Sequence, residues 1–268
     1  MSGPVLVSRQ GVVATLTLNR PDALNTLDFA MMDSLVAAVA DVAADDALRA
    51  VILRGAGKHF MAGGDLRTFA GELTKARAAR QAGFTQMIGR LHSAIELLQR
   101  MPHPVVARVH GAVAGFGLSL VAACDLAIAA DSAYFASAYR QIALTPDGGM
   151  SWTLPRIVGL RKATEILLLG ERFDAQQAMQ LGLVNRVVPV LALDATVEGV
   201  VQALVTGPTL ALRNAKRLLY QSSAHSLSEQ LDAESRSFGE CAGTADFEEG
   251  IAAFLEKRPP QFGRGSTP

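Results

Sequence analysis

Apolar and polar residues follow several different periodicities along this chain of 268 residues. Residues 4–21 contain two β-branched runs on either side of Gln10-Gly11, a pattern typical of a β-hairpin. Residues 26–46 place apolar side chains at helical spacing, with Thr26 or Asp28 as the candidate N-cap. The apolar run at 48–55 ends in glycine and predicts a short buried strand.

Strand and helix patterns continue to alternate through the middle of the chain. The spacing predicts a helix over 80–101, a strand within 104–111, a helix over 116–123 and a strand within 125–131. Such repetition indicates an α/β core. After Gly159 the pattern is mostly helical, with one strand within 183–189 and four helical stretches after Pro189. We therefore predict an α/β core over residues 1–205 and a helical region over 206–268, which is too short and too amphipathic to form a core of its own.

Composition narrows the class of protein. Half of the residues are hydrophobic, and 25 basic side chains balance 25 acidic ones, so the chain shows no charged surface for nucleic acid or an anionic membrane. No apolar run approaches the roughly 20 residues of a membrane span. Cys124 and Cys241 lie far apart, which indicates neither a disulfide framework nor a metal site. We expect a cytoplasmic protein whose partners are small molecules and further copies of itself.

A glycine-rich turn lies between the predicted strand at 104–111 and the predicted helix at 116–123. Gly115 and Gly117 flank Phe116 at the start of that helix. Glycines let the backbone approach a ligand closely, and the first helical turn directs unpaired N–H groups and the positive end of its dipole outward. The run from Gly111 to Gly117 also imitates a dinucleotide fingerprint, although not at the usual place near the N-terminus. The turn could therefore bind a ligand at the start of the helix, bind a nicotinamide cofactor, or serve only as a structural turn.

A second glycine turn follows the predicted strand at 48–55. It offers Gly63 and Gly64 immediately before Asp65 and Leu66. Two exposed backbone turns, each close behind a core strand, would together supply a pair of N–H donors for an oxyanion. This arrangement is more specific than either turn alone.

Six segments of the sequence resemble the crotonase superfamily, the enoyl-CoA hydratase/isomerase family. They are "LNRPDALNTL", "FMAGGDL", "PVVARVHGAVAGFGLSLVAACDLAIAADSAYF", "PDGGMSWTLPRIVG", "LLLGERFDAQQAMQLGLVNRVVP" and "EGIAAFLEKRPPQF", and they occur in family order between about residues 5 and 262. The resemblance implies a spiral of repeated ββα units, followed by a helical C-terminal region that assembles trimers, which often pair into hexamers. It also implies an acyl-CoA thioester as substrate, with no cofactor beyond the coenzyme A of that substrate.

The resemblance assigns roles to individual residues. It places the two amides that bind the thioester oxygen at Gly64 and Phe116. Coenzyme A contacts are implied along the loops next to these amides, and the tail is implied to reach the nucleotide of a neighbouring subunit. The implied binding residues are Ala23, Leu24, Ala62, Gly63, Asp65, Leu66, His92, Gly115, Gly117, Ser119, Tyr139, Phe254 and Lys257.

Departures from the family pattern bear on the reaction. Similar hydratases hold water between two glutamates, and those positions are Ser119 and Tyr139 here. Adding water needs both an acid and a base, so the usual hydration is disfavoured. Asp147, in a Pro-Asp-Gly loop, stands where similar isomerases carry an aspartate. One carboxylate can move a proton from C2 to C4 of an enoyl thioester, which predicts an enoyl-CoA isomerase, with hydration as the alternative.

Other interpretations stay open at this point. Pro146-Asp147-Gly148-Gly149 is also a good turn and helix cap, so Asp147 could cap a helix. His92 lies at helical spacing as a structural histidine would, yet similar 4-chlorobenzoyl-CoA dehalogenases have a catalytic histidine there and a nucleophilic aspartate at the Asp147 position. Tyr139 replaces the tryptophan of those enzymes. A non-catalytic homologue that binds coenzyme A or RNA is the alternative of another class. Residues 67–90 are predicted to form a wall of the acyl pocket.

Overall fold

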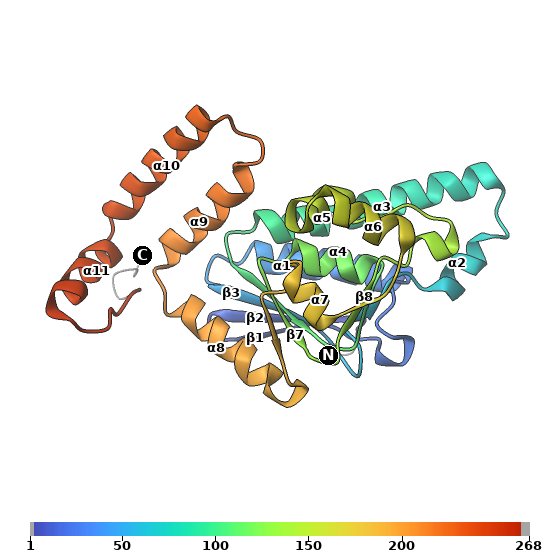
Figure 1. Ribbon diagram of the computed structural model, residues 1–268, viewed down its shortest axis with the longest axis horizontal. Coiled ribbons are helices and arrows are strands. Elements are labelled where there is room, and N and C mark those ends of the chain that lie inside the picture. The colour runs from blue at the N-terminus through green and yellow to red at the C-terminus, as the bar shows by residue number, and fades with distance from the viewer. Residues whose placement is uncertain (1–2, 264–268) are drawn as a thin grey trace.

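Two β-sheets enclosed by helices form the core of the computed structural model, which describes residues 3–263 (Figure 1). The larger sheet has six strands in the order β1-β2-β3-β5-β7-β10, and the smaller has four in the order β4-β6-β8-β9. The predicted α/β core is therefore confirmed. Residues 1–2 and 264–268, at the ends of the two predicted regions, lie outside the described residues.

The large sheet begins with the predicted hairpin. Strand β1 (Val5–Gln10) pairs antiparallel with β2 (Val13–Leu18), and β2 is followed across the sheet by the parallel strands β3 (Ala50–Gly55), β5 (Val105–Val109), β7 (Leu126–Ala130) and β10 (Arg186–Val188). Apart from Arg108 of β5, strands β5 and β7 place apolar side chains on both faces, because elements pack on each side of the sheet.

The small sheet is made of much shorter strands. Strands β4 (Met61–Ala62), β6 (Ala112–Ala114) and β8 (Tyr134–Ala136) run parallel, and β9 (Phe173–Asp174) pairs antiparallel with β8. Each of the three parallel strands follows a strand of the large sheet and precedes a helix, so that the ββα unit implied by the resemblance recurs through the core. Segments of two or three residues are too short to show strand periodicity in the sequence.

The first long helix, α1 (Phe29–Ala43), begins where a carboxylate caps it. Asp28 accepts a hydrogen bond of 2.8 Å from the N–H of Met31, whereas Thr26 donates to the carbonyl of Ala23 and caps no helix. The other helices of the core are η1 (Pro21–Ala23), α2 (Leu66–Glu72), α3 (Arg77–Arg100), α4 (Phe116–Ala123), η2 (Arg140–Ile142), α5 (Met150–Val158), α6 (Leu160–Leu169), α7 (Ala175–Gln180) and η3 (Val190–Ala192). Helix α3 corresponds to the helix predicted over 80–101, and it begins three residues earlier than predicted.

Helix α8 (Leu193–Val205) covers one face of the large sheet. Its buried residues Leu193, Val197 and Val201 form an apolar cluster with residues of β3, β5 and β7, such as Ala50 and Ile128. The main core lies on the other side of the sheet and contains all of α4, whose residues are buried along its whole length. The helix that begins at Phe116 is therefore packed on all sides by the core.

The last three helices extend away from the core (Figure 1). They are α9 (Thr209–Gln221), α10 (Leu227–Ala242) and α11 (Ala245–Glu256). A buried lysine fastens α9 to the core: Lys216 Nζ lies 2.7 Å from Asp125 Oδ2 and also donates to the carbonyls of Leu98 and His103. Beyond this attachment the helices expose large apolar side chains, which include Leu227, Leu231, Phe238, Phe254 and Leu255.

Within the described residues, no single helix is long and apolar enough to cross a membrane. The helical segments at 190–205 and 209–221 reach the length and apolar composition of a membrane span only when they are taken as a pair. The chain bends by 104° between them.

Candidate active site

The carboxyl ends of β4 and β6 bring the two glycine turns side by side. The strands pair in parallel with Ala62 opposite Ala114, so the residues that follow, Gly63 and Gly115, are neighbours. Both have positive φ, 82° and 51°. A Cβ atom on Gly115 would come within 3.3 Å of the Cα of Gly63. Glycine at these two positions therefore permits the close approach of two backbones.

The N–H groups of Gly64 and Phe116 are available to a ligand. Leu27 donates to the carbonyl of Gly63 and accepts from the N–H of Asp65, both at 2.8 Å, and this pairing leaves the N–H of Gly64 unused. Phe116 is the first residue of α4, where N–H groups have no partner within the helix. In the described part of the chain, neither amide donates to a protein acceptor, and both residues line one pocket.

This pocket has a volume of about 750 Å³. Its lining comes from the two glycine turns, from Leu27 and Met32, from α2 and α3, and from the segment 138–147. Helices α2 and α3 contribute Leu66, Phe69, Phe84, Thr85, Ile88, Gly89 and His92, and the segment contributes Ala138, Tyr139, Gln141, Ile142, Leu144, Thr145, Pro146 and Asp147. Five residues of the predicted wall over 67–90 line this pocket, and the acyl group as its occupant stays a prediction.

Most of the apolar lining was not singled out from the sequence. Phe84, Ile88 and His92 recur every four residues on α3, so they share one face of this helix. That spacing was a usable signal. By contrast, Leu27, Met32, Ile142 and Leu144 reach the pocket only through the tertiary fold.

Asp147 lies in the loop between η2 and α5, and it lines the pocket. Tyr139 donates a hydrogen bond of 2.6 Å to Oδ1 of Asp147, and the hydroxyl of Ser119 donates to its main-chain carbonyl at 2.9 Å. The N-cap residue of α5 is Gly149, and no side chain caps this helix. The alternative that Asp147 serves as a helix cap is therefore wrong.

Burial is the largest influence on the carboxyl group of Asp147, and it raises its pKa above the ordinary value. The hydrogen bond from Tyr139 acts in the opposite direction but does not cancel this effect. Burial also raises the pKa of the Tyr139 phenol, which therefore stays protonated as a donor. A carboxylate whose pKa is raised by an apolar pocket is suited to take up and return a proton.

His92 supports the loop that carries Asp147. The N–H of Gly148 donates to Nε2 of His92 at 3.2 Å, a bond that assigns the neutral tautomer with its proton on Nδ1. The ring also lines the pocket. The sequence left a structural and a catalytic role open for His92, and the structure shows a contact that positions the loop.

Two predicted binding residues lie behind the pocket surface. A Cβ atom on Gly117 would come within 2.5 Å of the carbonyl oxygen of Met61, so glycine at this position lets α4 pack on β4. Ser119 is buried, lies 3.3 Å from the Tyr139 hydroxyl and holds the carbonyl of Asp147. Neither residue lines the pocket. In this structure Gly117 serves packing and Ser119 supports the Asp147 loop, and their contact with substrate stays a prediction.

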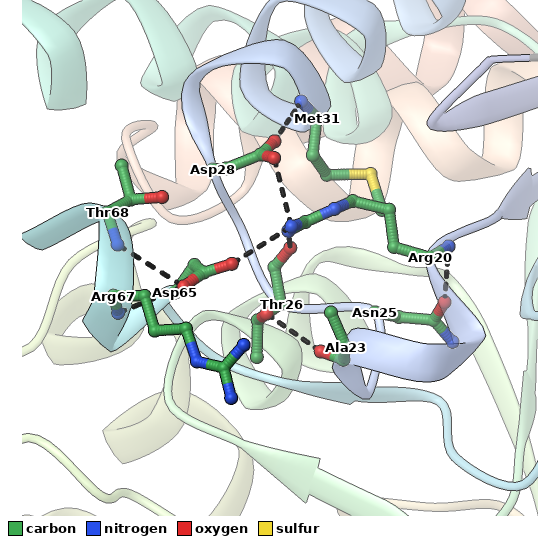
Figure 2. Close-up of polar contacts among 9 residues, drawn as sticks. All are labelled: Arg20, Ala23, Asn25, Thr26, Asp28, Met31, Asp65, Arg67 and Thr68. Atoms are coloured by element: carbon green, nitrogen blue, oxygen red, sulfur yellow. Dashed lines mark hydrogen bonds and ion pairs between the residues drawn. The ribbon is translucent and has the colours of Figure 1, made fainter.

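Asp65 is engaged within the protein, as Figure 2 shows. Its Oδ2 lies 2.9 Å from Arg20 Nη2, and its Oδ1 accepts from the N–H groups of Arg67 and Thr68 and so caps α2. Arg20 also pairs with Asp28 at 3.0 Å. Burial acts to raise the pKa of Asp65, but the bonds from Arg20 and the backbone hold it below its ordinary value. This ion pair fixes α2 next to the turn at Gly63 and Gly64.

The remaining predicted contacts for coenzyme A are divided between pocket and surface. Ala62 and Leu66 line the pocket, whereas Ala23 and Leu24 do not. Leu24 has positive φ, and its carbonyl accepts from the N–H of Ala62 at 3.1 Å, so this turn borders the pocket strand. The coenzyme A contacts of these residues stay a prediction.

Phe254 and Lys257 lie at the end of α11. Both are exposed, and neither lines the pocket of its own chain. Their predicted contact with the nucleotide of a neighbouring subunit stays a prediction. Among residues 3–263, no group of three or more His, Cys, Asp or Glu side chains is arranged to hold a metal ion.

Comparisons with known proteins agree with this geometry. Residues 8–265 match the family model for enoyl-CoA hydratase/isomerase. The chain is 36% identical over 250 residues to a probable enoyl-CoA hydratase of Rhodobacter capsulatus, covering 93% of this chain and 94% of the relative. It is 37% identical over 252 residues to the 1,2-epoxyphenylacetyl-CoA isomerase of Escherichia coli K12, with the same coverage. A crystal structure of enoyl-CoA hydratase from Mycobacterium smegmatis has a TM-score of 0.90 at 36% identity and covers 97% of this chain and 99% of that one.

The chain is an α/β protein with a paired-amide pocket, and it belongs to the enoyl-CoA hydratase/isomerase family of the crotonase superfamily. Its ββα core and helical C-terminal region are those of the crotonase fold. An acyl-CoA thioester is consistent with this family as the substrate. Because similar proteins are named both hydratase and isomerase, membership alone does not define the reaction.

Proposed function

We propose that this protein is an enoyl-CoA isomerase that moves a double bond through a thioester dienolate, with Asp147 as the proton carrier. The observation that carries this proposal is a pocket lined by one carboxylate, that of Asp147, together with the two unused amides of Gly64 and Phe116. No other Asp or Glu side chain lines this pocket among the described residues. The arrangement provides one group for proton transfer and one site for negative charge.

The reaction follows from these groups. The thioester oxygen accepts hydrogen bonds from the N–H groups of Gly64 and Phe116. The carboxylate of Asp147 removes a proton from C2 of a 3-enoyl thioester; the C2–H electrons form a C1–C2 double bond and the carbonyl π electrons move onto the thioester oxygen, which gives a dienolate with the C3–C4 double bond still in place. Protonated Asp147 then gives the proton to C4: the oxyanion re-forms the carbonyl, the C1–C2 electrons become the C2–C3 double bond, and the C3–C4 electrons bind the proton, which leaves a 2-enoyl thioester. One well-placed donor to such an oxyanion is worth about 3–4 kcal/mol in other enzymes.

The contacts of Asp147 support one oxygen as the proton carrier. Tyr139 occupies Oδ1 with a hydrogen bond of 2.6 Å, so Oδ2 is the oxygen left for substrate. Ser119 and Gly148 hold the main chain on either side of this carboxylate. The side chain that moves the proton is therefore restrained by its neighbours.

Hydration is the less favoured reaction for this pocket. The positions where the family resemblance expects the glutamates of hydratases hold Ser119 and Tyr139, and both side chains bond to Asp147. Neither hydroxyl replaces a carboxylate as a base near neutral pH. Dehalogenation is also less favoured, because Nε2 of His92 accepts from Gly148 and is not open to activate water.

We also propose that the protein forms the assembly predicted from its sequence. Coenzyme A enters as part of the substrate, and the exposed apolar side chains of α9 to α11 favour a trimer or a pair of trimers. In such an assembly Lys257 would supply a cation to the phosphates of a neighbouring subunit's substrate.

Hydrogen exchange at C2 tests the reaction directly. A 3-enoyl-CoA incubated with the enzyme in deuterated buffer is expected to exchange its C2 hydrogens and to yield the conjugated 2-enoyl thioester. Formation of a 3-hydroxyacyl thioester from 2-enoyl-CoA, without movement of the double bond, would instead establish hydration. Thioester binding with neither reaction would identify a non-catalytic homologue.

A further inference from the structure

The charge of the pocket lining restricts the acyl group. Asp147 is the only residue with a formally charged side chain among those that line the pocket in the described chain, and no lysine or arginine does so. His92 is neutral when it accepts from Gly148. An acyl group with a terminal carboxylate would therefore lose its hydration without meeting a cation, and it would share the pocket with the carboxylate of Asp147.

Aromatic side chains form the wall next to the oxyanion amides. Phe69 of α2 and Phe84 of α3 pack edge to face, with ring centroids 5.1 Å apart. A Cβ atom on Gly64 would come within 2.5 Å of the Phe69 ring, so this ring lies directly against the residue that carries an amide donor. The Asp65–Arg20 ion pair holds the start of α2 in place. The wall that borders the thioester position is thus apolar and fixed at its base.

The rim of the pocket is also apolar, although it faces solvent. Ile142 and Leu144 line the pocket and expose 39% and 48% of their surface. Clustered exposed apolar side chains around a cavity indicate a surface that a ligand covers. We expect a short acyl chain held at the amides to leave this rim uncovered.

We infer that the pocket selects a large, uncharged acyl group, a chain of about eight or more carbons or a ring system of similar bulk. The volume agrees: about 150 Å³ is enough for a benzene ring in a dry apolar cavity, and this pocket of about 750 Å³ holds the acyl group together with the thioester end of its carrier. The inference rests on the proposed function in taking the acyl part of an acyl-CoA as the occupant.

Binding of unreactive thioesters tests the inference separately from the reaction. Calorimetry with the full chain would compare butanoyl-CoA, decanoyl-CoA and the mono-CoA thioester of decanedioic acid. We expect decanoyl-CoA to bind at least about tenfold more tightly than either of the others, because it buries more apolar surface and carries no terminal charge. Equal or tighter binding of butanoyl-CoA, or of the dicarboxylic thioester, would overturn the inference.

A pair of rim and surface variants locates the effect. Ile142→Ser changes the apolar rim, and Leu168→Ser changes an exposed leucine of α6 that does not line the pocket. We expect Ile142→Ser to weaken decanoyl-CoA binding about fivefold and to leave butanoyl-CoA unchanged, while Leu168→Ser changes neither. An equal effect of Ile142→Ser on both thioesters, or none on either, would contradict a long acyl group at the rim. If the enzyme did not exchange the C2 hydrogens of a 3-enoyl-CoA but still bound decanoyl-CoA most tightly, only the proposed reaction would be contradicted.

Discussion

The hydroxyl of Tyr139 donates a hydrogen bond of 2.6 Å to Oδ1 of Asp147. This bond acts against burial and lowers the pKa of Asp147 from the value that burial alone would impose. Tyr139 therefore keeps more of the carboxylate ionised at a given pH. The rate should respond to its loss through the pH profile, because a proton carrier must first be ionised to remove a proton.

Replacing this tyrosine tests the relationship. Tyr139→Phe removes the hydrogen bond, so the pKa of Asp147 rises further and the acid limb of kcat/KM moves to higher pH. The loss of activity is expected to be largest at acidic pH and to shrink as the pH rises. Tyr134→Phe is the control, because Tyr134 packs under Arg172 and does not line the pocket. An unmoved acid limb in Tyr139→Phe would show that the bond has no influence on the proton carrier.

Removing the charge of Asp147 separates catalysis from folding. Asp147→Asn keeps an oxygen for the Tyr139 bond but cannot carry a proton, so turnover and C2 exchange should fall by about 100-fold or more. The exposed Asp22, changed to asparagine, gives a control with unaltered turnover. Wild-type exchange rates in Asp147→Asn, with bound thioester confirmed, would exclude the assigned role.

The same variant has an expected effect on the free energy of unfolding. Because the folded-state pKa of Asp147 lies above its ordinary value of 3.8, ionisation in the folded protein is unfavourable. Stability contributed by the neutral form is complete below that ordinary value and declines as the pH rises toward the folded-state value. Asp147→Asn should therefore equal the wild type in acid and match or exceed it at neutral pH. Denaturant unfolding at several pH values measures this difference.

Gly117 provides a test of packing. Gly117→Ala places a methyl group against the Met61 carbonyl and is expected to destabilise the fold by about 1–3 kcal/mol. Gly83→Ala is the matched control: a Cβ atom at Gly83 of α3 meets nothing within 4 Å, and alanine there should stabilise the helix by about 1 kcal/mol. Thermal unfolding would measure both. Equal stability of the two variants would contradict the packing role of Gly117.

The buried ion pair that attaches α9 gives another expected outcome. Lys216→Met leaves the carboxylate of Asp125 buried without its cation, so the free energy of unfolding should decrease by about 3–5 kcal/mol. Lys162→Met removes an exposed pair with Glu165 and should cost at most about 1 kcal/mol. Urea unfolding compares the two lysines, and similar losses would show that burial does not set the strength of the Lys216 attachment.

Light scattering tests the predicted assembly. The exposed apolar residues of α10 and α11 should lie between subunits, so the mass in solution is expected to be that of three or six chains. Phe238→Asp should reduce this mass, because it places a charge on an exposed apolar position of α10. A stable, fully active monomer of the wild type would contradict both the assembly and the predicted role of Lys257.

The helices and strands that could be predicted from the sequence are those whose apolar residues repeat at a regular spacing. The hairpin at residues 4–21, the strand at 48–55 and the helix at 116–123 were found because their apolar residues repeat within each element. Strands β4 and β8 escaped because two or three residues cannot display a period, and their pairing depends on distant segments. The ββα order came from the family resemblance rather than from periodicity.

The candidate site was predictable to a similar extent. The turns at Gly63 and Gly115 were found because glycine is required where two backbones meet, and the structure places them side by side. The position of Ser119 behind the loop was not predictable, since one residue along a fully buried helix decides whether a side chain meets the ligand or its neighbours. The bond between Tyr139 and Asp147 depends on how η2 folds toward α5, for which the sequence carries no local pattern.

The parallel pairing of β4 with β6 has a consequence for how this scaffold can acquire new activities. The separation of the two amide donors is a property of the backbone register, with Ala62 opposite Ala114, and not of any side chain at those positions. Under the proposed function, the groups that would select the reaction stand elsewhere, on α3, α4 and the loop before α5, at positions 92, 119, 139 and 147. Substitutions at these positions would then alter the proton transfer, or let water take part, and would leave the relative position of the two amides unchanged.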